Sequence, residues 1–379
     1  MFDDRFRERE EWYDAYFKEL NSLETIGDFA VVPRPANVQV LPLAELFTVK
    51  WDNVAHHWKK KARIVVRGDL ERDINTQDLY SPVANYDTIR LFVALHGLFG
   101  FQLRQADISC AYLHGNRKKE TFLELPSGHP DRIGRRRVWK TTSSIYGLRD
   151  APLRWNETIN RELEDFGFKR SQTDSCLYVK GSGDQRMYLC LYVDDLIYMS
   201  RMGDQLDRLE SFLERKFKVK TTHFVNQYVG FEVEKQPTGL KMHCRRYIEK
   251  LVEVYGLVNA RGAVVPLTRS TFQTGTAVQS PQLPDKRPYQ SIVGALAYVG
   301  HLCRPDISYA VNFLSRHNTC PTAHLLRLAK QVVVYLRGTS RLGLTFQRQL
   351  QDQKLQLQAY CDSDWAQEKK PQKCRWVLR

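Results

Sequence analysis

The sequence lacks any apolar run that approaches the roughly 20 residues a membrane-spanning helix needs. Its longest apolar stretches, around Leu91–Leu95 and Leu189–Val193, are short and soon broken by polar residues. The N-terminus reads Met1-Phe2-Asp3-Asp4-Arg5 and lacks the basic-then-apolar order of a secretory signal peptide. We therefore expect a soluble, intracellular chain that does not associate with a membrane.

Closely spaced cysteines are absent, because the 8 cysteines form no Cys-x-x-Cys pair. That spacing argues against a zinc site and against a disulfide framework. We expect reduced, mostly buried thiols at every position: Cys110, Cys176, Cys190, Cys244, Cys303, Cys320, Cys361 and Cys374.

Internal repeats and low-complexity segments are absent as well. With 379 residues, 42% of them hydrophobic, the chain can bury a sizeable core and form two or three domains. Its net charge of +14 suits a polyanionic partner such as nucleic acid. Simple solubility explains a basic surface equally well, so the charge alone leaves both readings open.

Hydrophobic periodicity predicts strands that alternate irregularly with helices, which favours an α+β fold over a doubly wound sheet. The polar stretch 262–285 is the best candidate for a linker. The predicted helices are Met1–Leu23, Thr88–Leu98, Ala151–Phe166, Asp204–Phe217, Arg246–Tyr255, Tyr289–Tyr298, Ile307–Leu314 and Ala323–Leu336. The predicted strands are 59–67, Phe101–Ile108, Tyr228–Glu234 and Leu355–Tyr360, together with a hairpin of Met187–Val193 and Leu196–Met199.

Two adjacent acids, Asp194 and Asp195, interrupt the apolar run of this hairpin. Burying them without a partner is costly, and a hard cation such as Mg²⁺ would offset their repulsion. Asp107 ends another strand-like run 87 residues upstream. Three carboxylates on adjacent strands can hold the metal pair of a phosphoryl-transfer enzyme. The alternative is an exposed Asp-Asp turn with an unrelated Asp107.

Tyr192-Val193-Asp194-Asp195 between two strands, with an acid at an upstream strand end, resembles the palm of a reverse transcriptase. Further stretches resemble the copia-type retrotransposon Pol polyprotein and occur in that family's order. They include Lys61-Ala-Arg-Ile-Val-Val-Arg67-Gly68, Gln105-Ala-Asp-Ile-Ser-Cys-Ala-Tyr112, Ser144-Ile-Tyr146-Gly147-Leu148, Ala151-Pro-x-x-Trp155-Asn156, Pro288-Tyr289-x-x-Ile-Val-Gly294-x-Leu-x-Tyr298 and Tyr360-Cys-Asp-Ser-Asp-Trp365-Ala366.

The resemblance implies an α+β right-hand polymerase with five segments. These are the fingers and palm at 11–225, the primer grip and thumb at 226–262, a linker at 263–287, a connection segment at 288–354 and a truncated ribonuclease H start at 355–379.

The implied activity is RNA-directed DNA polymerisation, in which a dNTP is transferred to the 3′-hydroxyl of a primer. By similarity, Asp107, Asp194 and Asp195 are the catalytic residues and bind two Mg²⁺ ions, with Mn²⁺ as an alternative. The implied partners are an RNA template, a DNA primer and dNTP, in the cytoplasm or the nucleus. The alternative is an inactive remnant that binds RNA or DNA or has no function. Oligomeric state stays open.

The resemblance also implies a nucleotide site. Lys61, Arg63 and Arg67 would contact the triphosphate or template, although a solvated edge strand is the plain alternative. The backbone amides from Ile108 to Ala111 would cradle the triphosphate. Tyr112 would be the steric gate against ribonucleotides, or else a packing residue.

The remaining implied sites lie further along the chain. Tyr146 and Gly147 would pack against the template and incoming base, or form a plain loop. Tyr228 and Gly230 would belong to the primer grip, or to an ordinary strand. Asp362 would be the first acid of a ribonuclease H whose other acids are missing, so we expect no such activity. Arg149-Asp150 departs from the family's Lys-Gln and introduces an acid near the template path.

Overall fold

The computed structural model describes residues 2–52, 57–72, 79–132, 134, 136–268, 280–348, 358–362 and 377–378. Its α-helices are α1 (Phe2–Ile26), α2 (Tyr86–Phe99), α3 (Ala151–Asp165), α4 (Gly203–Lys216), α5 (Arg245–Val254), α8 (Arg287–Leu302), α9 (Ser308–Ser315) and α10 (Ala323–Gly338). Short 3-10 turns lie at Gly68–Leu70, Ala111–His114, Gly183–Gln185 and Pro305–Ile307. Among the described helices, none is both long and apolar enough to cross a membrane.

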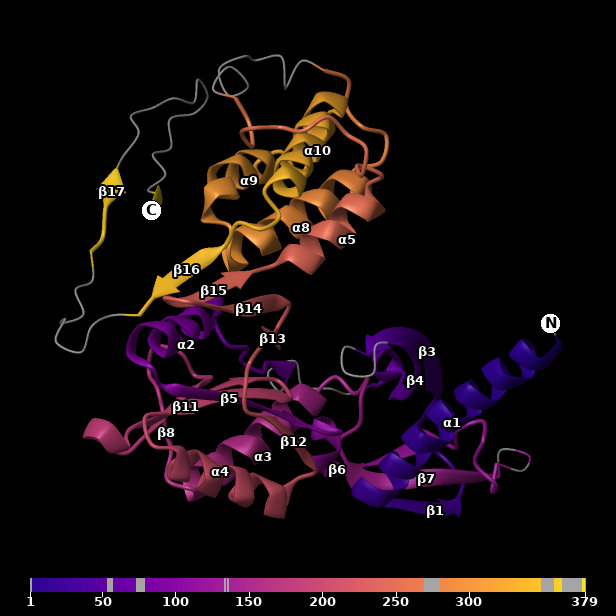
Figure 1. The fold of residues 1–379 in the computed structure, drawn as a ribbon. Helices are drawn as coiled ribbons and strands as arrows, with labels where there is room; N and C mark the ends of the chain where they lie inside the picture. The colour runs from indigo at the N-terminus through magenta and orange to yellow at the C-terminus, as the bar shows by residue number, and fades with distance from the viewer. Residues whose placement is uncertain are drawn as a thin grey trace.

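The strands form separate sheets, several of which can be followed in Figure 1. The six-stranded sheet has the order β12 (Val219–Thr222), β5 (Gln102–Ile108), β11 (Asp195–Ser200), β10 (Met187–Tyr192), β9 (Leu177–Lys180) and β8 (Lys169–Arg170). A second sheet has the order β1 (Phe29–Pro33), β7 (Arg137–Ser143), β6 (Asn116–Glu124) and β2 (Val40–Leu41). A third has the order β13 (Gln227–Tyr228), β14 (Phe231–Gln236), β15 (Gly239–His243) and β16 (Leu344–Gln347). Two strand pairs complete the set: β3 (Leu43–Asp52) with β4 (His57–Val66), and β17 (Cys361–Asp362) with β18 (Val377–Leu378).

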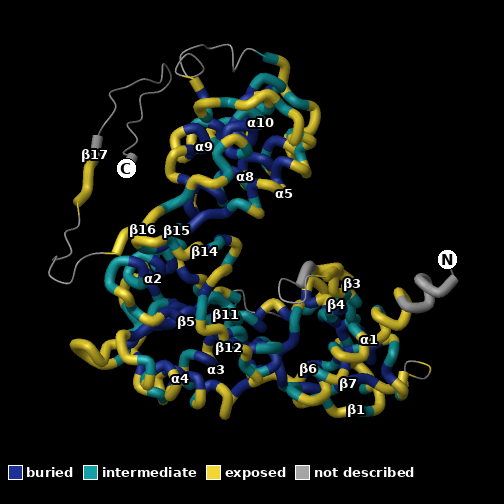
Figure 2. The backbone as a smooth tube through the Cα atoms, viewed as in Figure 1, coloured by how far each residue is buried: buried dark blue, intermediate teal, exposed yellow. Residues whose placement is uncertain are grey.

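Helices cover both faces of the six-stranded sheet, which explains the nearly continuous apolar runs of its strands β10 and β11. Alternate residues of β11 face opposite sides of the sheet. Leu196 and Tyr198 pack with α3 and α4, whereas Ile197 and Met199 pack with α2. All four side chains are fully buried. The predicted hairpin is confirmed, and its strands lie in the interior (Figure 2).

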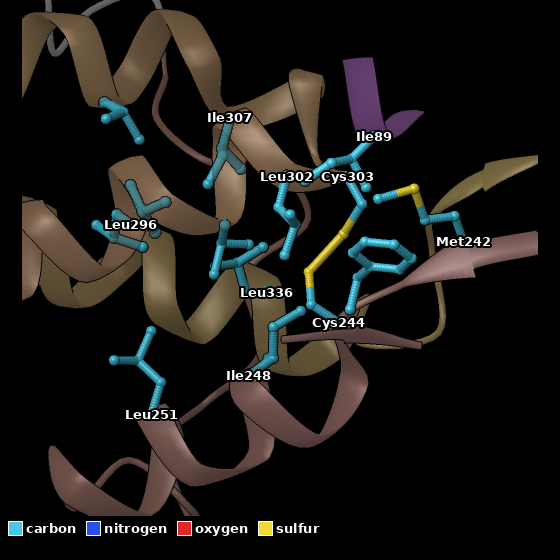
Figure 3. Packing of buried hydrophobic residues seen from close by; sticks show 14 of the residues in the cluster. Ile89, Met242, Cys244, Ile248, Leu251, Leu296, Leu302, Cys303, Ile307 and Leu336 are labelled. Carbon is cyan, nitrogen blue, oxygen red and sulfur yellow. A yellow bond between two sulfur atoms is a disulfide. The ribbon is translucent and has the colours of Figure 1, made fainter. Parts of the chain in front are cut away.

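The helices α5, α8, α9 and α10 form a helical body that packs on the third sheet and on α2 (Figure 1). Figure 3 shows its core, where residues such as Ile89, Met242, Ile248, Leu296 and Leu336 meet from five elements. One hydrophobic cluster therefore joins segments that the sequence assigned to a thumb at 226–262 and to a connection segment at 288–354.

Two of the eight cysteines are paired, so the prediction of eight reduced thiols is wrong. Cys244 and Cys303 form a disulfide in the core of the helical body (Figure 3). Cys244 is the N-cap of α5 and Cys303 the C-cap of α8, and 59 residues separate them. Packing of the two helices brings the thiols together, and no local spacing signals it.

The eight predicted helices are confirmed within a few residues at each end. Predicted strand Tyr228–Glu234 is interrupted, because β13 ends at Tyr228 and β14 begins at Phe231. The predicted strand at 355–360 is not found: residues 358–360 lie outside any strand, and 355–357 lie outside the described residues. Part of the predicted linker, 269–279, also lies outside them.

Candidate active site

The turn of the β10–β11 hairpin consists of two residues, Val193 and Asp194, because Tyr192 pairs with Asp195. Val193 has a φ of 61°, in the left-handed region that a β-branched residue rarely adopts. The indole Nε1 of Trp155 donates a hydrogen bond to the Val193 carbonyl oxygen at 2.6 Å. Such strain persists only where surrounding contacts hold it, and it concentrates at functional sites.

The three acids predicted from the sequence meet at this turn. Asp107 on β5 lies directly opposite Asp195 on β11 in the antiparallel register. The Asp194 carbonyl oxygen accepts a hydrogen bond from the Ile108 amide at 3.0 Å. Like charges at directly opposed positions destabilise a sheet, so this pairing is a local cost.

The neighbouring acids also change the pKa of Asp195. Burial, and then the charges of Asp194 and Asp107, raise the pKa of its carboxyl to about 6. A hydrogen bond from the Gln105 side chain acts in the opposite direction. Negative charge therefore accumulates at a half-buried position that a cation would relieve.

Asp107 lies between the acid pair and a cationic edge. Burial and then the charge of Asp194 raise the pKa of Asp107, whereas Lys61, Lys220 and Lys50 lower it. Lys220 on β12 is the direct register partner of Asp107. Lys220 on β12, Asp107 on β5 and Asp195 on β11 therefore lie in a row across the sheet.

The acids Asp107, Asp194 and Asp195, called the acid cluster below, offer donors that fit Mg²⁺, because this ion prefers carboxylate oxygens. Burial, and then repulsion between the acids, raises the pKa of Asp107 and of Asp195, and a divalent ion would offset the repulsion. Within the described residues, however, no three His, Cys, Asp or Glu side chains already converge as a set of metal ligands. Binding an ion therefore requires the carboxyl groups to turn toward a common point.

Burial alternates along β4. Lys61 and Arg63 are half-buried, whereas the intervening Ala62 and Ile64 are buried in the core beneath α1. Burial lowers the pKa of the Lys61 ammonium, and the charges of Glu19 and Asp107 oppose that change. Lys61 is thus electrostatically coupled to the acid cluster.

Arg63 and Arg67 have different surroundings. The Arg63 guanidinium lies over the ring of Tyr146, 6.0 Å from its centroid. Arg67 is exposed beyond the end of β4, and its Nε and Nη2 each donate to a carboxylate oxygen of Asp69 at 2.8 Å. Arg67 is therefore occupied by a local partner, whereas Arg63 faces the aromatic pair described next.

The two predicted aromatic site residues contact each other. The ring centroids of Tyr112 and Tyr146 lie 4.8 Å apart. Burial, and then the charge of Asp194, raises the pKa of both hydroxyls. Both rings therefore lie within electrostatic reach of the acid cluster.

The Ile108 amide is not free to cradle a triphosphate, contrary to the prediction. It donates to Asp194, and the Ser109 amide donates to the Lys218 carbonyl oxygen at 2.9 Å. The predicted strand Phe101–Ile108 is confirmed as β5, and β12 pairs with it up to Ile108. The strand β12 was not predicted from the sequence.

Gly147 joins its loop to the end of β4. Its φ is 96°, and a Cβ added there would lie 2.0 Å from the Val66 carbonyl oxygen. The Val66 amide donates to the Tyr146 carbonyl oxygen at 2.7 Å. Only glycine leaves room for this contact, which fixes Tyr146 relative to the strand of Lys61.

Tyr228 ends β13, and Gly230 lies in the turn between β13 and β14. Tyr228 is 2% exposed, and its hydroxyl donates to the Asp195 carbonyl oxygen at 3.4 Å. Gly230 has a φ of 85° and lies against the Tyr298 hydroxyl. Tyr228 therefore supports the acid strand from inside the core, while Gly230 forms the turn itself.

Asp150 is not an open acid, although its sequence position suggested one near the template path. It is 7% exposed, and Arg117 Nε lies 3.0 Å from its Oδ1. Arg154 approaches the other oxygen at 3.4 Å. The acid is neutralised within a buried ion network. Asp362 lies in the short pair β17–β18, away from these residues in sequence and in Figure 1.

Three residues at the site escaped sequence reasoning as functional candidates: Trp155, Gln105 and Lys220. Trp155 stands in the Ala-Pro-x-x-Trp motif, which could have singled it out. Gln105 has the same parity as Asp107 on β5, so strand alternation puts both on one face. No sequence pattern marked Lys220, because its position opposite Asp107 depends on pairing between the distant strands β12 and β5.

Comparisons with known proteins fit this geometry. A family profile described as "Reverse transcriptase (RNA-dependent DNA polymerase)" matches residues 27–269. A Pol polyprotein from transposon RE1 of Arabidopsis thaliana is 31% identical over 367 residues, covering 95% of this chain and 24% of that protein. The putative transposon Ty5-1 protein YCL074W of Saccharomyces cerevisiae is 32% identical over 260 residues, covering 68% of this chain and 82% of that protein.

Among solved structures, a foamy viral protease–reverse transcriptase in complex with double-stranded DNA matches 86% of this chain and 48% of that chain. Its TM-score is 0.46 at 13% sequence identity. This chain spans about a quarter of the length of the RE1 and RE2 relatives. The chain belongs to the reverse transcriptase (RNA-dependent DNA polymerase) family and is similar to the Pol polyproteins of copia-type retrotransposons.

Proposed function

We propose that this chain is an RNA-directed DNA polymerase that transfers a nucleotide from dNTP to the 3′-hydroxyl of a primer on an RNA template. The observation that carries the proposal is the pairing of Asp107 with Asp195 beside the strained turn that holds Asp194. A sheet tolerates two opposed acids at this cost where function requires the charge.

In this proposal the six-stranded sheet with its helices serves as the palm. The β1–β7–β6–β2 sheet and the β3–β4 pair serve as fingers, and the helical body serves as the thumb and connection. The Lys61 strand and the Tyr146-Gly147 loop, joined through Val66, would then move together as one wall of the nucleotide site.

Asp107, Asp194 and Asp195 would hold two divalent ions, Mg²⁺ or Mn²⁺. When bound, these supply activation of the primer hydroxyl and charge neutralisation at the phosphates. Lys61 and Arg63 would bind the triphosphate by charge. The Tyr112 ring, braced by Tyr146, would lie beneath the sugar and exclude a 2′-hydroxyl. Trp155 would keep Asp194 in place by fixing the Val193 carbonyl.

Primer extension on an RNA template with purified wild-type and Asp194→Asn chains tests the proposal. We expect Mg²⁺-dependent incorporation of dNTP by the wild type and none by the variant. The matched control is Asp184→Asn, an exposed acid in the turn between β9 and β10 whose ion-pair partner among the described residues is Arg201. A folded wild type that binds primer–template in a salt-sensitive way without extending it would indicate an inactive remnant instead.

A further inference from the structure

The turn between β13 and β14 is held by a side chain from the helical body. Tyr228 pairs with Phe231, so the turn consists of Val229 and Gly230, whose φ values are 40° and 85°. The hydroxyl of Tyr298, on α8, donates a hydrogen bond to the Val229 carbonyl oxygen at 2.9 Å. The Tyr298 motif was recognised in the sequence but received no role there.

The contact is close enough to require glycine. A Cβ on Gly230 would lie 1.8 Å from the Tyr298 hydroxyl oxygen and 3.1 Å from the ring carbon that bears it. The Tyr298 ring is itself fixed, because it lies 4.8 Å from the ring of Tyr247 and 6.1 Å from that of Tyr86. Burial raises the pKa of Tyr298, so its hydroxyl remains a donor at neutral pH.

The turn also connects with the acid cluster. Tyr228 reaches the Asp195 carbonyl oxygen from within the core. Tyr86 shares a side-chain hydrogen bond with Tyr192, which is the register partner of Asp195. The helical body is therefore linked to the acid strands both through the turn and through neighbouring tyrosines.

We propose that Tyr298 is a positioning residue of the polymerase: its hydroxyl fixes the Val229–Gly230 turn, and the fixed turn sets where the primer terminus lies relative to Asp194 and Asp195. The inference rests on the proposed function. Tyr298 lies outside the region 27–269 that the family profile matches, so the helical body contributes a residue of its own to this site.

The first test compares Tyr298→Phe with Tyr255→Phe. Tyr255 donates to Ser291 Oγ at 3.2 Å, between α5 and α8 and away from the turn. Both variants lose one hydroxyl hydrogen bond of the helical body. We expect Tyr298→Phe to lower kcat for primer extension about tenfold, with the KM for dNTP within about twofold of the wild type. Tyr255→Phe should keep wild-type kinetics.

The second test is a double-mutant cycle with Gly230→Ala. Removing the Tyr298 hydroxyl leaves the ring carbon at 3.1 Å as the nearest atom, a contact that a small shift can relieve. We expect Gly230→Ala to lower the melting temperature by about 5 °C in the wild-type background and by about half as much in Tyr298→Phe.

The outcomes separate the two proposals. Tyr298→Phe with wild-type kcat, or equal losses from Gly230→Ala in both backgrounds, would overturn the role of Tyr298. A wild type that never extends a primer would contradict the proposed function by itself. The stability cycle would then still decide whether Tyr298 holds the turn.

Discussion

Asp107 and Asp195 face each other across β5 and β11, two acids at directly opposed positions in the interior of a sheet. Such a pair lowers stability, because like charges repel and both carboxyl groups are partly buried. The neighbouring cation Lys220 faces Asp107 from the other side and offsets only part of the repulsion. Stability and the proposed activity should therefore respond in opposite directions to neutralising one acid.

Asp195→Asn is expected to raise the free energy of unfolding at pH 7.5 without metal by about 0.5–1 kcal/mol, because it removes the repulsion from Asp107 and Asp194. The same variant should abolish primer extension. Chemical denaturation and primer extension measure the two effects. The control Asp184→Asn should change stability by less than about 0.5 kcal/mol and keep activity. A loss of stability in Asp195→Asn would contradict the repulsion inferred at this pair.

The pH dependence of stability follows from the raised pKa of Asp195, about 6 against the ordinary 3.8 of an aspartate. Between these values the folded state binds more protons than the unfolded state, so the free energy of unfolding falls as pH rises from about 4 to about 6. After allowance for solvent screening, the fall from this group is on the order of 1 kcal/mol. Denaturation series of the wild type and Asp195→Asn isolate it, because their difference should change within this window and stay level above it.

Much of the site could be predicted because its residues carry local signals. The Asp194-Asp195 pair inside an apolar run and the acid at the end of β5 both mark the site, and the structure pairs them. The helices were found from their apolar spacing. What escaped prediction depends on register between distant segments: the use of the Ile108 amide, the Lys220 partner and the Cys244–Cys303 disulfide.

Asp150 shows how sequence context can mislead. As a departure from the family pattern it suggested an acid exposed to the template, yet Arg117 neutralises it in the interior. Only the fold brings β6 against the start of α3, so no pattern in the sequence connects the two residues. The strands β6 and β7 were also not predicted from the sequence, because their charged residues obscure the alternation that identifies a strand.

Gly147→Ala is expected to destabilise the chain by about 2–4 kcal/mol, because a Cβ would meet the Val66 carbonyl oxygen and the φ of 96° disfavours any L side chain. The loop would separate from β4 and carry Tyr146 away from Tyr112. Gly294→Ala in α8 is the matched control, since nothing lies within 4 Å of the added Cβ. That control should stabilise the helix by about 0.5–1 kcal/mol. Equal effects of the two substitutions in thermal unfolding would refute the close approach at Gly147.

The last prediction concerns the buried ion network that joins three segments around Arg117. Its Nη2 lies 2.6 Å from Glu71 Oε1 and its Nε lies 3.0 Å from Asp150 Oδ1, and the side chains of Arg117 and Glu71 are each only 5% exposed. Arg117→Met keeps the length of the side chain and removes the charge, which leaves Glu71 without this cation and Asp150 with the longer contact to Arg154.

We expect Arg117→Met to cost about 3–5 kcal/mol, because a buried charge that loses its partner keeps its full desolvation penalty. Arg34 directly follows β1 and forms a more exposed ion pair with Glu124, at 2.8 Å. The control Arg34→Met removes this pair and should cost about 0.5 kcal/mol or less. If the network serves only stability, the double variant Arg117→Met with Asp150→Asn should recover part of the loss in urea unfolding, because one of the two acids that lose Arg117 is then neutral. No recovery would mean that Glu71, rather than Asp150, holds the charge that Arg117 neutralises.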